Sequence, residues 1–518
     1  MCIRDRVSSV YRDSYGCVFV GTYNSGLYRF CSDDETYSSI EKNYVITIME
    51  DKEGSVWAGT NGYGLYRFKE SKFITYGRLS GLSQPVVFPV LESYDGSIWL
   101  GTWAGAMYKL KDNNLTKYTF GEKLSPHDTV LSLFEDKNRV LWAGVYGKGL
   151  LMLDDGIPRL YDEYDGLPEK NIAALYKDSR DILWIGMMSR GLAYLKDGII
   201  THFPGTDNLG VSGITEDVDG YVWIATRIGP FKIKGDQLVS EFTNLEKIGT
   251  LSIYPASNRR LLFASDNGLT IYNSETGAVT IDRKSGLDTK TIFDVIEDFD
   301  GNLWLTSNKG IKFISKNDLE SFLSGESSKV DPRTYSFKDG LLTPECNGGT
   351  QPNIWRARDG RIWIPTAEGL TVVDPGDMRQ NTVPPPVHIT SVTADENNYP
   401  VKGEKKFSFK PGTTAISFEY TGLSFLFPDQ VIFKYMLEGF DERWKNVDTL
   451  RNAYYTNLSP GKYVFKVVAA NNDNVWNNDP AVLTVIIKPF FWQTWWFRIL
   501  VILVTGCCAV YYLSLIHI

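Results

Sequence analysis

The fold of most of this chain is decided by the stretch from Asp51 to Phe68, which reads DKEGSVWAGTNGYGLYRF. Asp51 and Gly54 frame a tight turn, because the carboxylate accepts hydrogen bonds from local backbone N–H groups and glycine adopts a positive φ that other residues resist. The apolar runs on either side of this turn predict two antiparallel strands. Trp57, on the second strand, is expected to pack between neighbouring sheets.

The same pattern recurs along the chain: an Asp turn, a strand with Trp at its centre, Gly-Thr and then Gly-Leu. Copies begin at Asp13, Asp51, Ser93, Asp136, Asp178, Asp217, Asp298 and Ala357, with a degraded copy around Phe263. The spacing of the aromatic anchors stays near about 40 residues until the last, longer interval, and about 40 residues is the length of a propeller blade. These anchors are Phe19, Trp57, Trp99, Trp142, Trp184, Trp223, Phe263, Trp304 and Trp363.

The nine repeats exceed the number of blades in a usual ring, which has four to eight. We therefore predict an all-β protein with a seven-bladed β-propeller built on the anchors from Trp99 to Trp363. Phe19 and Trp57 then belong to remnant blades of an upstream propeller. Two copies depart from the repeat: the one at Phe263, and the one that carries Met187 where most others have Thr.

A Gly-Leu element precedes several of the first strands, as at Gly81, Gly166, Gly286 and Gly340. The Asp turn joins two antiparallel strands at one end of a blade. The Gly-Leu loops and the residues after Gly-Thr must therefore share the opposite end. We expect both sets of loops to line one rim of the propeller.

The bulk composition limits the classes of protein that fit. At 518 residues the chain is too long for one hydrophobic core, so two or three domains are expected. The formal net charge is −8 and there is no basic tract, which argues against nucleic-acid binding by this region. The four histidines are scattered without metal-ligand spacing, so we predict no metal site and no cofactor.

The six cysteines show neither a disulfide framework nor the spacing of a zinc site. A bridge between Cys17 and Cys31 is one interpretation. Because Cys17 lies in a strand-like run, we favour the other one, in which its thiol is a small buried hydrophobic group.

The segment after Pro375 changes in character. The three prolines at 384–386 predict a stiff linker, and residues 387–487 contain strand-like runs separated by turn signals. About 100 residues of this kind indicate an immunoglobulin-like β-sandwich. Tyr454, Tyr455 and Tyr463 are expected to be core and corner residues of this sandwich instead of a ligand cage. The predicted strands are Ala415 to Tyr420, Ile432 to Gly439, Asn452 to Leu458, Lys462 to Asn471 and Leu483 to Lys488.

A membrane segment follows, in the run WQTWWFRILVILVTGCCAVYYL that starts at Trp492. Ile499 to Leu513 carries no charge, and a spanning helix needs about 20 apolar residues. Trp492, Trp495 and Trp496 are placed for an interfacial aromatic belt, and Arg498 is able to snorkel. We predict a transmembrane helix; a buried core helix is the alternative.

The two ends, MCIRDR and LSLIHI, can be encoded by one DNA segment read in opposite senses. Such inverted flanks resemble a transposon-end adapter, so we expect residues 1–6 and 513–518 to be foreign and the natural protein to extend further. The organisation predicted between them is remnant blades at 7–70, the propeller at 71–383, the sandwich at 384–488 and a truncated transmembrane helix at 489–512.

Taken together, these segments resemble a known receptor class. The repeats resemble two-component regulator propeller repeats, and LEGFDERW (from Leu437) with AYYTNLSPGKYVFKVVAANNDNVWN (from Ala453) resembles the triple-tyrosine domain. With PFFWQTWWFRIL (from Pro489), they resemble the periplasmic sensor region of hybrid two-component system receptors. The resemblance implies a homodimeric, single-pass protein of the bacterial inner membrane that senses oligosaccharides and signals through the sandwich and helix to a cytoplasmic histidine kinase.

Positions that differ between repeats on the shared rim are candidates for ligand recognition, since framework positions recur. Trp103 and Tyr146 are able to stack on sugar faces, and Arg190 and Arg227 to pair with carboxylate or sulfate. Any one of them also fits a solvated loop residue, so the prediction concerns the group. The candidates are Tyr23, Asn61, Trp103, Tyr146, Lys170, Asn171, Arg190, Arg227, Asp266, Asn308, Asn347 and Glu368.

Three functions remain open. The favoured one is a receptor whose rim binds a glycan fragment and whose affinity differs between two signalling states. A propeller glycosidase or polysaccharide lyase needs a carboxylate pair or a Tyr/His set converging on the channel, whereas most acidic residues here belong to Asp turns. We therefore expect no catalytic residue in this region. A protein-recognition propeller is the third possibility.

Overall fold

The computed structural model describes residues 6–31, 43–69, 71–242, 248–378 and 381–517. Its contacts divide the chain into two units. Residues 71–378 form one unit, and the described residues on either side of that segment form the other.

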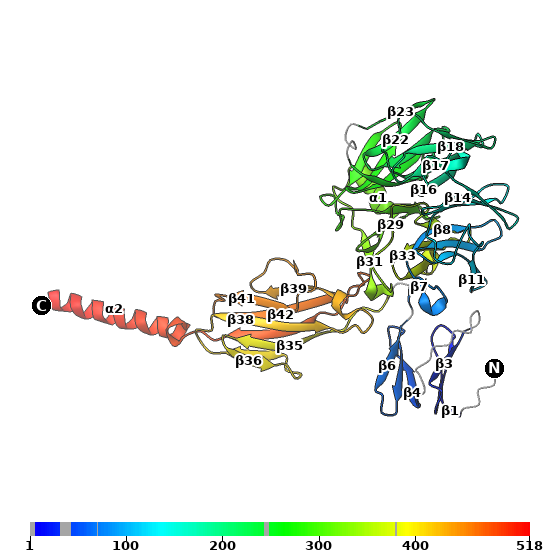
Figure 1. The fold of residues 1–518 in the computed structure, drawn as a ribbon. Coiled ribbons are helices and arrows are strands. Elements are labelled where there is room, and N and C mark those ends of the chain that lie inside the picture. The colour runs from blue at the N-terminus through cyan, green and yellow to red at the C-terminus, as the bar shows by residue number, and fades with distance from the viewer. Residues whose placement is uncertain (1–5, 32–42, 70, 243–247, 379–380, 518) are drawn as a thin grey trace. The chain divides into compact units, whose positions relative to one another are not determined.

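Residues 71–378 form seven four-stranded antiparallel sheets, the blades of a β-propeller (Figure 1). Blades 1 to 6 contact each other in turn through their innermost strands, a shared hydrophobic core joins blade 6 to blade 7, and blade 7 contacts the innermost strand of blade 1, so the ring closes. This confirms the predicted seven-bladed all-β fold.

The strands of blades 1 to 6 follow the chain from the innermost to the outermost. Blade 1 consists of β8 (Val87–Glu92), β9 (Ile98–Thr102), β10 (Ala106–Lys111) and β11 (Asn114–Tyr118), and blade 2 of β12 (Val130–Glu135), β13 (Leu141–Val145), β14 (Gly149–Asp154) and β15 (Ile157–Tyr161). Blade 3 consists of β16 (Ile172–Lys177), β17 (Leu183–Met187), β18 (Leu192–Lys196) and β19 (Ile199–His202), and blade 4 of β20 (Val211–Glu216), β21 (Val222–Thr226), β22 (Gly229–Lys234) and β23 (Gln237–Val239). Blade 5 consists of β24 (Thr250–Pro255), β25 (Arg260–Ser265), β26 (Gly268–Asn273) and β27 (Gly277–Ile281), and blade 6 of β28 (Asp294–Glu297), β29 (Leu303–Ser307), β30 (Gly310–Ile314) and β31 (Arg333–Tyr335).

Blade 7 is built from both ends of this unit. Its strands β32 (Trp355–Arg356), β33 (Ile362–Thr366) and β34 (Gly369–Val373) are completed by β7 (Phe73–Tyr76). In the antiparallel register of β7 with β34, Phe73 lies opposite Val373 and Tyr76 opposite Leu370. The ring is therefore closed by backbone hydrogen bonds between its first and last strands.

The repeat motif explains the geometry of each blade. In blade 3, Asp178 Oδ1 accepts hydrogen bonds from the N–H groups of Arg180 and Ile182, both at 3.0 Å. Its other oxygen, Oδ2, accepts from the indole Nε1 of Trp184 at 3.0 Å. The predicted turn is confirmed. The bond to the indole was not predicted, and it ties the turn to the buried aromatic anchor.

The Gly-Leu element also has a local cause. Gly166 ends the short 3-10 helix η2 (Glu163–Asp165) with φ of 92°, and the next side chain, Leu167, is buried. Gly81 and Gly340 end η1 (Arg78–Ser80) and η3 (Phe337–Asp339) in the same left-handed conformation. Glycine stops the helix there because it adopts this conformation without a Cβ clash.

The two irregular repeats do not interrupt the ring. Phe263 takes the place of the tryptophan in β25, is fully buried, and lies 5.7 Å from the ring of Trp223. Met187 ends β17 and is also fully buried. Blade 6 differs in another way, because the helix α1 (Lys316–Leu323) is inserted between β30 and β31.

The other unit begins with two three-stranded sheets. They are β1 (Val7–Arg12), β2 (Val18–Thr22) and β3 (Leu27–Phe30), and β4 (Val45–Glu50), β5 (Val56–Thr60) and β6 (Leu65–Phe68). Phe19 and Val45 are among the buried residues of the core that the two sheets share. They have the strand order of propeller blades, which supports the interpretation of this region as remnant blades.

The favoured interpretation of Cys17 was wrong. Cys17 and Cys31 form a disulfide, with their Cα atoms 4.4 Å apart. Cys17 precedes β2 and Cys31 follows β3, so the antiparallel pairing of Val18 with Phe30 brings the two thiols together. A buried position in a strand region does not exclude a bridge when its cross-strand neighbour is also cysteine.

A β-sandwich follows in the same unit. One sheet has the order β36-β35-β38-β41 and the other β37-β43-β42-β39-β40, with β37 parallel to β43. Phe418 and Phe465, from different sheets, stack with ring centroids 4.1 Å apart in the core. The strands of the sandwich are β35 (Val387–Ala394), β36 (Asn397–Pro400), β37 (Lys406–Phe409), β38 (Ala415–Gly422), β39 (Ile432–Glu438), β40 (Lys445–Asn446), β41 (Asn452–Thr456), β42 (Gly461–Ala470) and β43 (Ala481–Ile487). The other short 3-10 helices of the described chain are η4 (Pro375–Asp377), η5 (Pro428–Gln430) and η6 (Phe491–Gln493).

Two of the three tyrosines behave as predicted. Tyr455 is buried and donates to Asp441 Oδ2 at 2.5 Å, and Tyr463 is buried and donates to the carbonyl of Ser459 at 2.8 Å. Tyr454 is 71% exposed, so the prediction was wrong for this residue. Neighbouring residues of a strand face opposite sides, and burial of Tyr455 turns Tyr454 outward.

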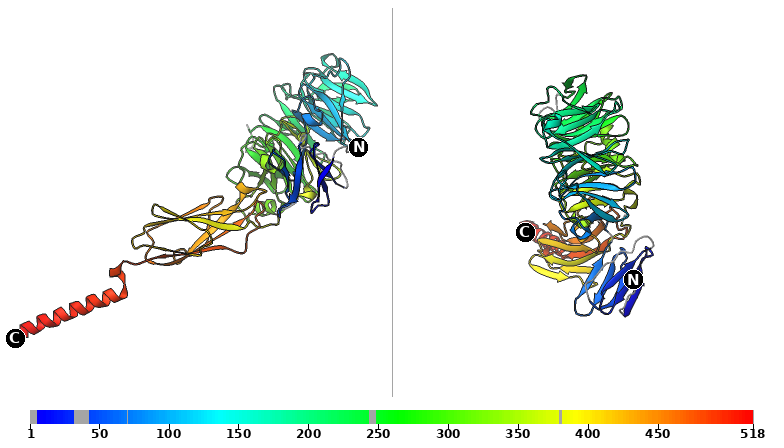
Figure 2. Two further views of the ribbon diagram at one scale, coloured as in Figure 1. Left: turned by 90° about the horizontal axis from the view of Figure 1, so that it is seen from below. Right: turned by 45° about the vertical axis from the view of Figure 1, so that its right-hand side comes forward.

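The chain continues into one apolar helix, α2 (Trp495–His517), which is drawn in red in Figure 2. The stretch Trp495–Ile516 has the length and composition of a membrane span, and none of its most apolar part is buried against the rest of the described chain. The predicted helix is confirmed, although it begins at Trp495 and not at residue 489.

Candidate functional site

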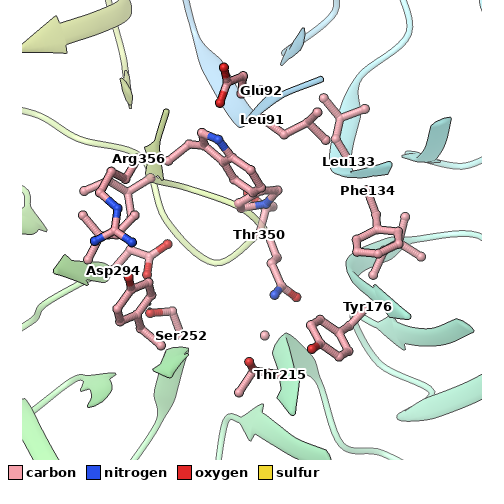
Figure 3. A pocket seen from close by; sticks show the side chains of 18 of the residues that line it. Leu91, Glu92, Leu133, Phe134, Tyr176, Thr215, Ser252, Asp294, Thr350 and Arg356 are labelled. Carbon is pink, nitrogen blue, oxygen red and sulfur yellow. Dashed lines mark hydrogen bonds between the residues drawn. The ribbon is translucent and has the colours of Figure 1, made fainter. Parts of the chain in front are cut away.

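A cavity of about 530 Å³ lies in the central channel of the propeller. Residues from the innermost strands of several blades line it, and their side chains converge on it in Figure 3. Glu92, Glu135 and Pro255 end their strands there, and Ser93 begins the turn after β8. The cavity therefore lies at the end of the ring that carries the Asp turns.

A segment of the loop before blade 7 crosses the channel and forms the floor of this cavity. The carbonyl of Gln351 accepts from the N–H of Leu133 in blade 2 at 3.2 Å. The side-chain amide of Gln351 exchanges two hydrogen bonds with the backbone of Ile214 in blade 4, at 2.9 and 2.7 Å. Pro352 O accepts from the N–H of Val90 in blade 1 at 3.0 Å. We call residues 350–353 the plug.

Asp294 is a buried carboxylate beside the plug. Its Oδ1 accepts from Ser252 Oγ at 2.5 Å and from the N–H of Val295 at 2.8 Å. Its Oδ2 accepts only one longer bond, 3.3 Å, from the N–H of Asn353 in the plug. Burial raises the pKa of Asp294 to about 6, against the opposing effect of these hydrogen bonds.

Aromatic side chains form much of the cavity wall. Phe134 and Tyr176 come from neighbouring blades, with ring centroids 6.2 Å apart, and Tyr254 and Trp355 line the wall as well. Burial raises the pKa of Tyr176 to about 12 and also raises the pKa of Tyr254. Both phenols are therefore neutral near pH 7 and retain their O–H donors.

Two carboxylates near the mouth are engaged in holding blades together. Glu135, in blade 2, accepts hydrogen bonds from two groups of blade 1: Ser93 Oγ at 2.8 Å and the N–H of Tyr94 at 2.9 Å. Glu92 pairs with Arg358 at 3.2 Å, from blade 1 to blade 7. The same position in other blades repeats this role, as in the bonds of Glu216 with Ser179 and of Glu297 with Ser257. These carboxylates therefore hold neighbouring blades together.

Arg356 carries the remaining positive charge of the wall. Its Nη1 donates to the carbonyl of Glu297, and its guanidinium lies 4.5 Å from the ring centroid of Phe299. Among the described residues, no carboxylate lies within ion-pair distance of this guanidinium. It therefore keeps N–H donors for a further acceptor.

The rim predicted from the sequence lies at the opposite end of the ring from this cavity. Trp103 and Tyr146 follow the second strands of blades 1 and 2 and are each 50% exposed, with ring centroids 6.4 Å apart. Asn171 Oδ1 accepts from the N–H of Gly147 at 2.9 Å, and Lys170 pairs with Glu163 at 3.3 Å. The structure therefore brings the aromatic pair together on the rim.

The other rim candidates are more dispersed. The backbone N–H of Arg190 donates to Glu169 at 2.8 Å, and the side chain of Asn347 donates to the carbonyl of Val87. Arg227, Asn308 and Glu368 are exposed, each after the second strand of its blade, where Asp266 also lies.

Tyr23 and Asn61 follow the second strands of the two three-stranded sheets in the other unit, where the ring of Tyr23 stacks on that of Tyr44 with centroids 4.3 Å apart. None of the predicted candidates lines the cavity.

The sequence reasoning missed the cavity residues Asp294, Gln351 and Arg356. One signal was present: the interval between Trp304 and Trp363 is longer than the others, which marks an insertion before blade 7. The path of this insertion across the channel depends on contacts with residues more than a hundred positions away, such as Ile214. A local sequence pattern therefore could not predict it.

Comparison with known proteins agrees with this architecture. Residues 424–488 match the Y_Y_Y domain, and residues 39–62 match the two component regulator propeller. A curated relative, histidine kinase P4 of Formosa agariphila, is 26% identical over 259 residues, which is 48% of this chain and 18% of the relative. The chain thus spans less than a fifth of the length of that protein.

Two solved structures from B. thetaiotaomicron are similar over 93% of this chain. The extracellular domain of the putative hybrid two component system BT3049 has a TM-score of 0.76 at 22% identity, and 68% of it is covered. That of the putative one component system BT4673 has a TM-score of 0.48 at 18% identity, and 69% of it is covered. The chain therefore carries a two component regulator propeller repeat and a Y_Y_Y domain, on the fold of the BT3049 extracellular domain.

Proposed function

We propose that this chain is the extracytoplasmic ligand-sensing region of a membrane sensor histidine kinase of the hybrid two-component type. The observation that carries the proposal is the order of its parts: a propeller, a Y_Y_Y domain and an apolar helix. Only residues 488–494 separate the end of β43 from the start of α2, so a change in the sandwich reaches the helix through a short link.

The disulfide supports the location. Disulfides form and persist in oxidising compartments such as the bacterial periplasm and are rare in the cytosol. The bridge between Cys17 and Cys31 therefore favours a periplasmic position for the part of the chain before α2. With α2 as a single span, the proposed place of the protein is the inner membrane.

The proposed ligand is an oligosaccharide derived from a complex glycan. Trp103 and Tyr146 present two exposed aromatic faces side by side, the arrangement that stacks on sugar rings, and exposed arginines lie on the same rim. We further propose that the protein acts as a homodimer, in which the ligand shifts the pairing of two sandwiches and two helices.

An enzymatic role finds less support in the geometry. Glu92 and Glu135 are engaged in contacts between blades, so the cavity offers Asp294 without a second free carboxylate among the residues that line it. Glycoside hydrolysis ordinarily uses two carboxylates on either side of the scissile bond. We propose that the part of the protein present here binds its ligand without transforming it.

Titration calorimetry of the detergent-solubilised chain against a panel of neutral and acidic oligosaccharides tests the binding proposal. At least one is expected to bind, and Trp103→Ala and Tyr146→Ala are each expected to weaken it about tenfold or more, since buried aromatic contacts dominate such sites. Tyr221→Ala removes an exposed aromatic ring from the Asp-turn end and is the matched control. Absence of binding to every glycan by the wild-type chain contradicts the proposal.

A further inference from the structure

The cavity on the Asp-turn side has the properties of a binding site that the rim does not explain. Its volume of about 530 Å³ falls within the range of small-molecule sites, about 300 to 1,000 Å³. The plug closes it toward the rim, because residues 351–353 bond to strands of blades 1, 2, 4 and 6. A ligand must therefore enter from the Asp-turn end.

The wall selects for a ring with hydroxyl groups. Phe134, Tyr176 and Trp355 offer flat apolar faces, on which the C–H face of a sugar ring packs. Hydroxyl groups surround these faces, from Thr215 and Ser252 as well as from the two neutral tyrosines. A lining that combines aromatic faces with hydroxyl groups suits a polyhydroxylated ring better than a purely apolar ligand.

Two charged groups then define the ligand further. Asp294 Oδ2 holds only the long bond from Asn353, so it has capacity to accept a hydrogen bond from a ligand hydroxyl. Arg356 has spare N–H donors and no carboxylate partner among the described residues, and guanidinium groups bind carboxylates with two parallel bonds. Figure 3 shows both side chains on the same side of the cavity.

The two carboxylates at the mouth of the cavity already have partners, so they repel a bound anion only weakly. Arg358 pairs with Glu92, and Glu135 is held by Ser93 and the backbone of Tyr94. Among the described residues that line the cavity, Arg356 is thus the positive charge without a carboxylate partner, and it lies on the same side as the buried carboxyl of Asp294 (Figure 3).

We propose that the cavity binds one sugar residue that carries a carboxylate, a uronic acid, with the carboxylate on Arg356 and a hydroxyl on Asp294. The inference rests on the proposed function only in taking carbohydrate as the ligand class; the site is separate from the rim. Because Asn353 of the plug shares Asp294 with the ligand, occupancy of the cavity acts directly on the segment that bonds to four blades.

Titration calorimetry with D-glucuronate as the probe, and D-glucose and L-glutamate as comparison ligands, tests this. The wild-type chain is expected to bind glucuronate at least about tenfold more tightly than glucose, because a buried polar site discriminates strongly against a ligand that leaves its charge unpaired. Arg356→Gln is expected to abolish that preference, and Arg356→Lys to retain part of it. Asp294→Asn is expected to weaken both sugars.

Arg159→Gln, at an exposed position of β15 on the outside of blade 2, is the matched control and is expected to leave glucuronate binding unchanged. Circular dichroism and the thermal midpoint of each variant separate a loss of the site from a loss of the fold. Glucuronate binding that falls in Trp103→Ala or Arg227→Gln but survives in Arg356→Gln overturns the cavity proposal and leaves the sensor function standing. Tight binding of glutamate with none of glucuronate overturns it as well. If no oligosaccharide binds to the chain while glucuronate still binds through Arg356, the result instead contradicts the function proposed for the rim.

Discussion

The indole Nε1 of Trp304 donates a 2.9 Å hydrogen bond to Asp298 Oδ2, while Asp298 Oδ1 accepts from the N–H groups of Asp300 and Asn302. One carboxylate thus fixes both the turn of blade 6 and the buried anchor of its second strand. The same pairing joins Asp51 to Trp57, Asp178 to Trp184 and Asp217 to Trp223.

Asp298→Ala is expected to lower the free energy of unfolding of the propeller by about 2 to 4 kcal/mol. The substitution leaves the fully buried indole N–H of Trp304 and two turn amides without their acceptor, and each unsatisfied buried group costs about 1 to 3 kcal/mol. Urea unfolding followed by tryptophan fluorescence measures the change. Asp300→Ala, at an exposed position of the same turn, is the control, and a loss for Asp298→Ala no larger than for this control contradicts the role of the pair.

Cys17 and Cys31 are expected to resist alkylation until a reductant is added, whereas Cys507 and Cys508 are exposed and free. Reduction, or the double substitution Cys17→Ser with Cys31→Ser, is expected to destabilise the sheet β1-β2-β3 by about 3 kcal/mol, the chain-entropy value for a loop of this length. Mass spectrometry of alkylated peptides and proteolysis of that sheet report the two effects. Alkylation of Cys17 in protein that has not been reduced contradicts the bridge.

The buried carboxyl of Asp294 makes stability depend on pH in a defined direction. Its folded pKa of about 6 lies above 3.8, the ordinary value for an aspartate carboxyl, so between pH 4 and pH 6 the folded state binds more protons than the unfolded state. The free energy of unfolding is therefore expected to fall as pH rises through this window, by up to about 3 kcal/mol from this group.

Asp294→Asn is expected to remove that contribution, so the stability of the wild type relative to the variant declines between pH 4 and pH 7. Urea unfolding at a series of pH values measures it. Asp300→Asn removes a charge from an exposed position and is expected to show no such trend relative to wild type. A wild type that gains stability over the variant as pH rises contradicts the assignment.

The sequence predicted those parts of the fold that rest on local pattern. The Asp turns and the Trp spacing located the strands, because each blade repeats the same short-range hydrogen bonds. The pattern did not reveal that Trp363 is buried without a hydrogen-bond partner for its indole, at the blade where Ala357 stands in place of Asp. It also did not reveal the strand β7 that completes blade 7, since that pairing joins residues at the two ends of the unit.

The candidate site was less predictable for the same physical reason. Variable loop positions identify the rim, where Trp103 and Tyr146 do meet. The cavity instead depends on Gln351 reaching Ile214 and on Asn353 reaching Asp294, contacts between distant parts of the chain that no repeat pattern encodes. The error at Cys17 was of another kind: the burial of this residue was predicted, but Cys31, opposite it on the neighbouring strand, was not recognised as its disulfide partner.

In the proposed function, this region senses a ligand and passes the signal through α2. The most direct test joins a histidine kinase catalytic region to the C-terminal end of α2 and measures its autophosphorylation in membrane vesicles, with the oligosaccharide that calorimetry identifies on the propeller side. We expect the rate to change several-fold on ligand addition, and we expect this change to be lost in Trp103→Ala and kept in Tyr221→Ala. Equal rates with and without saturating, demonstrably bound oligosaccharide would contradict it.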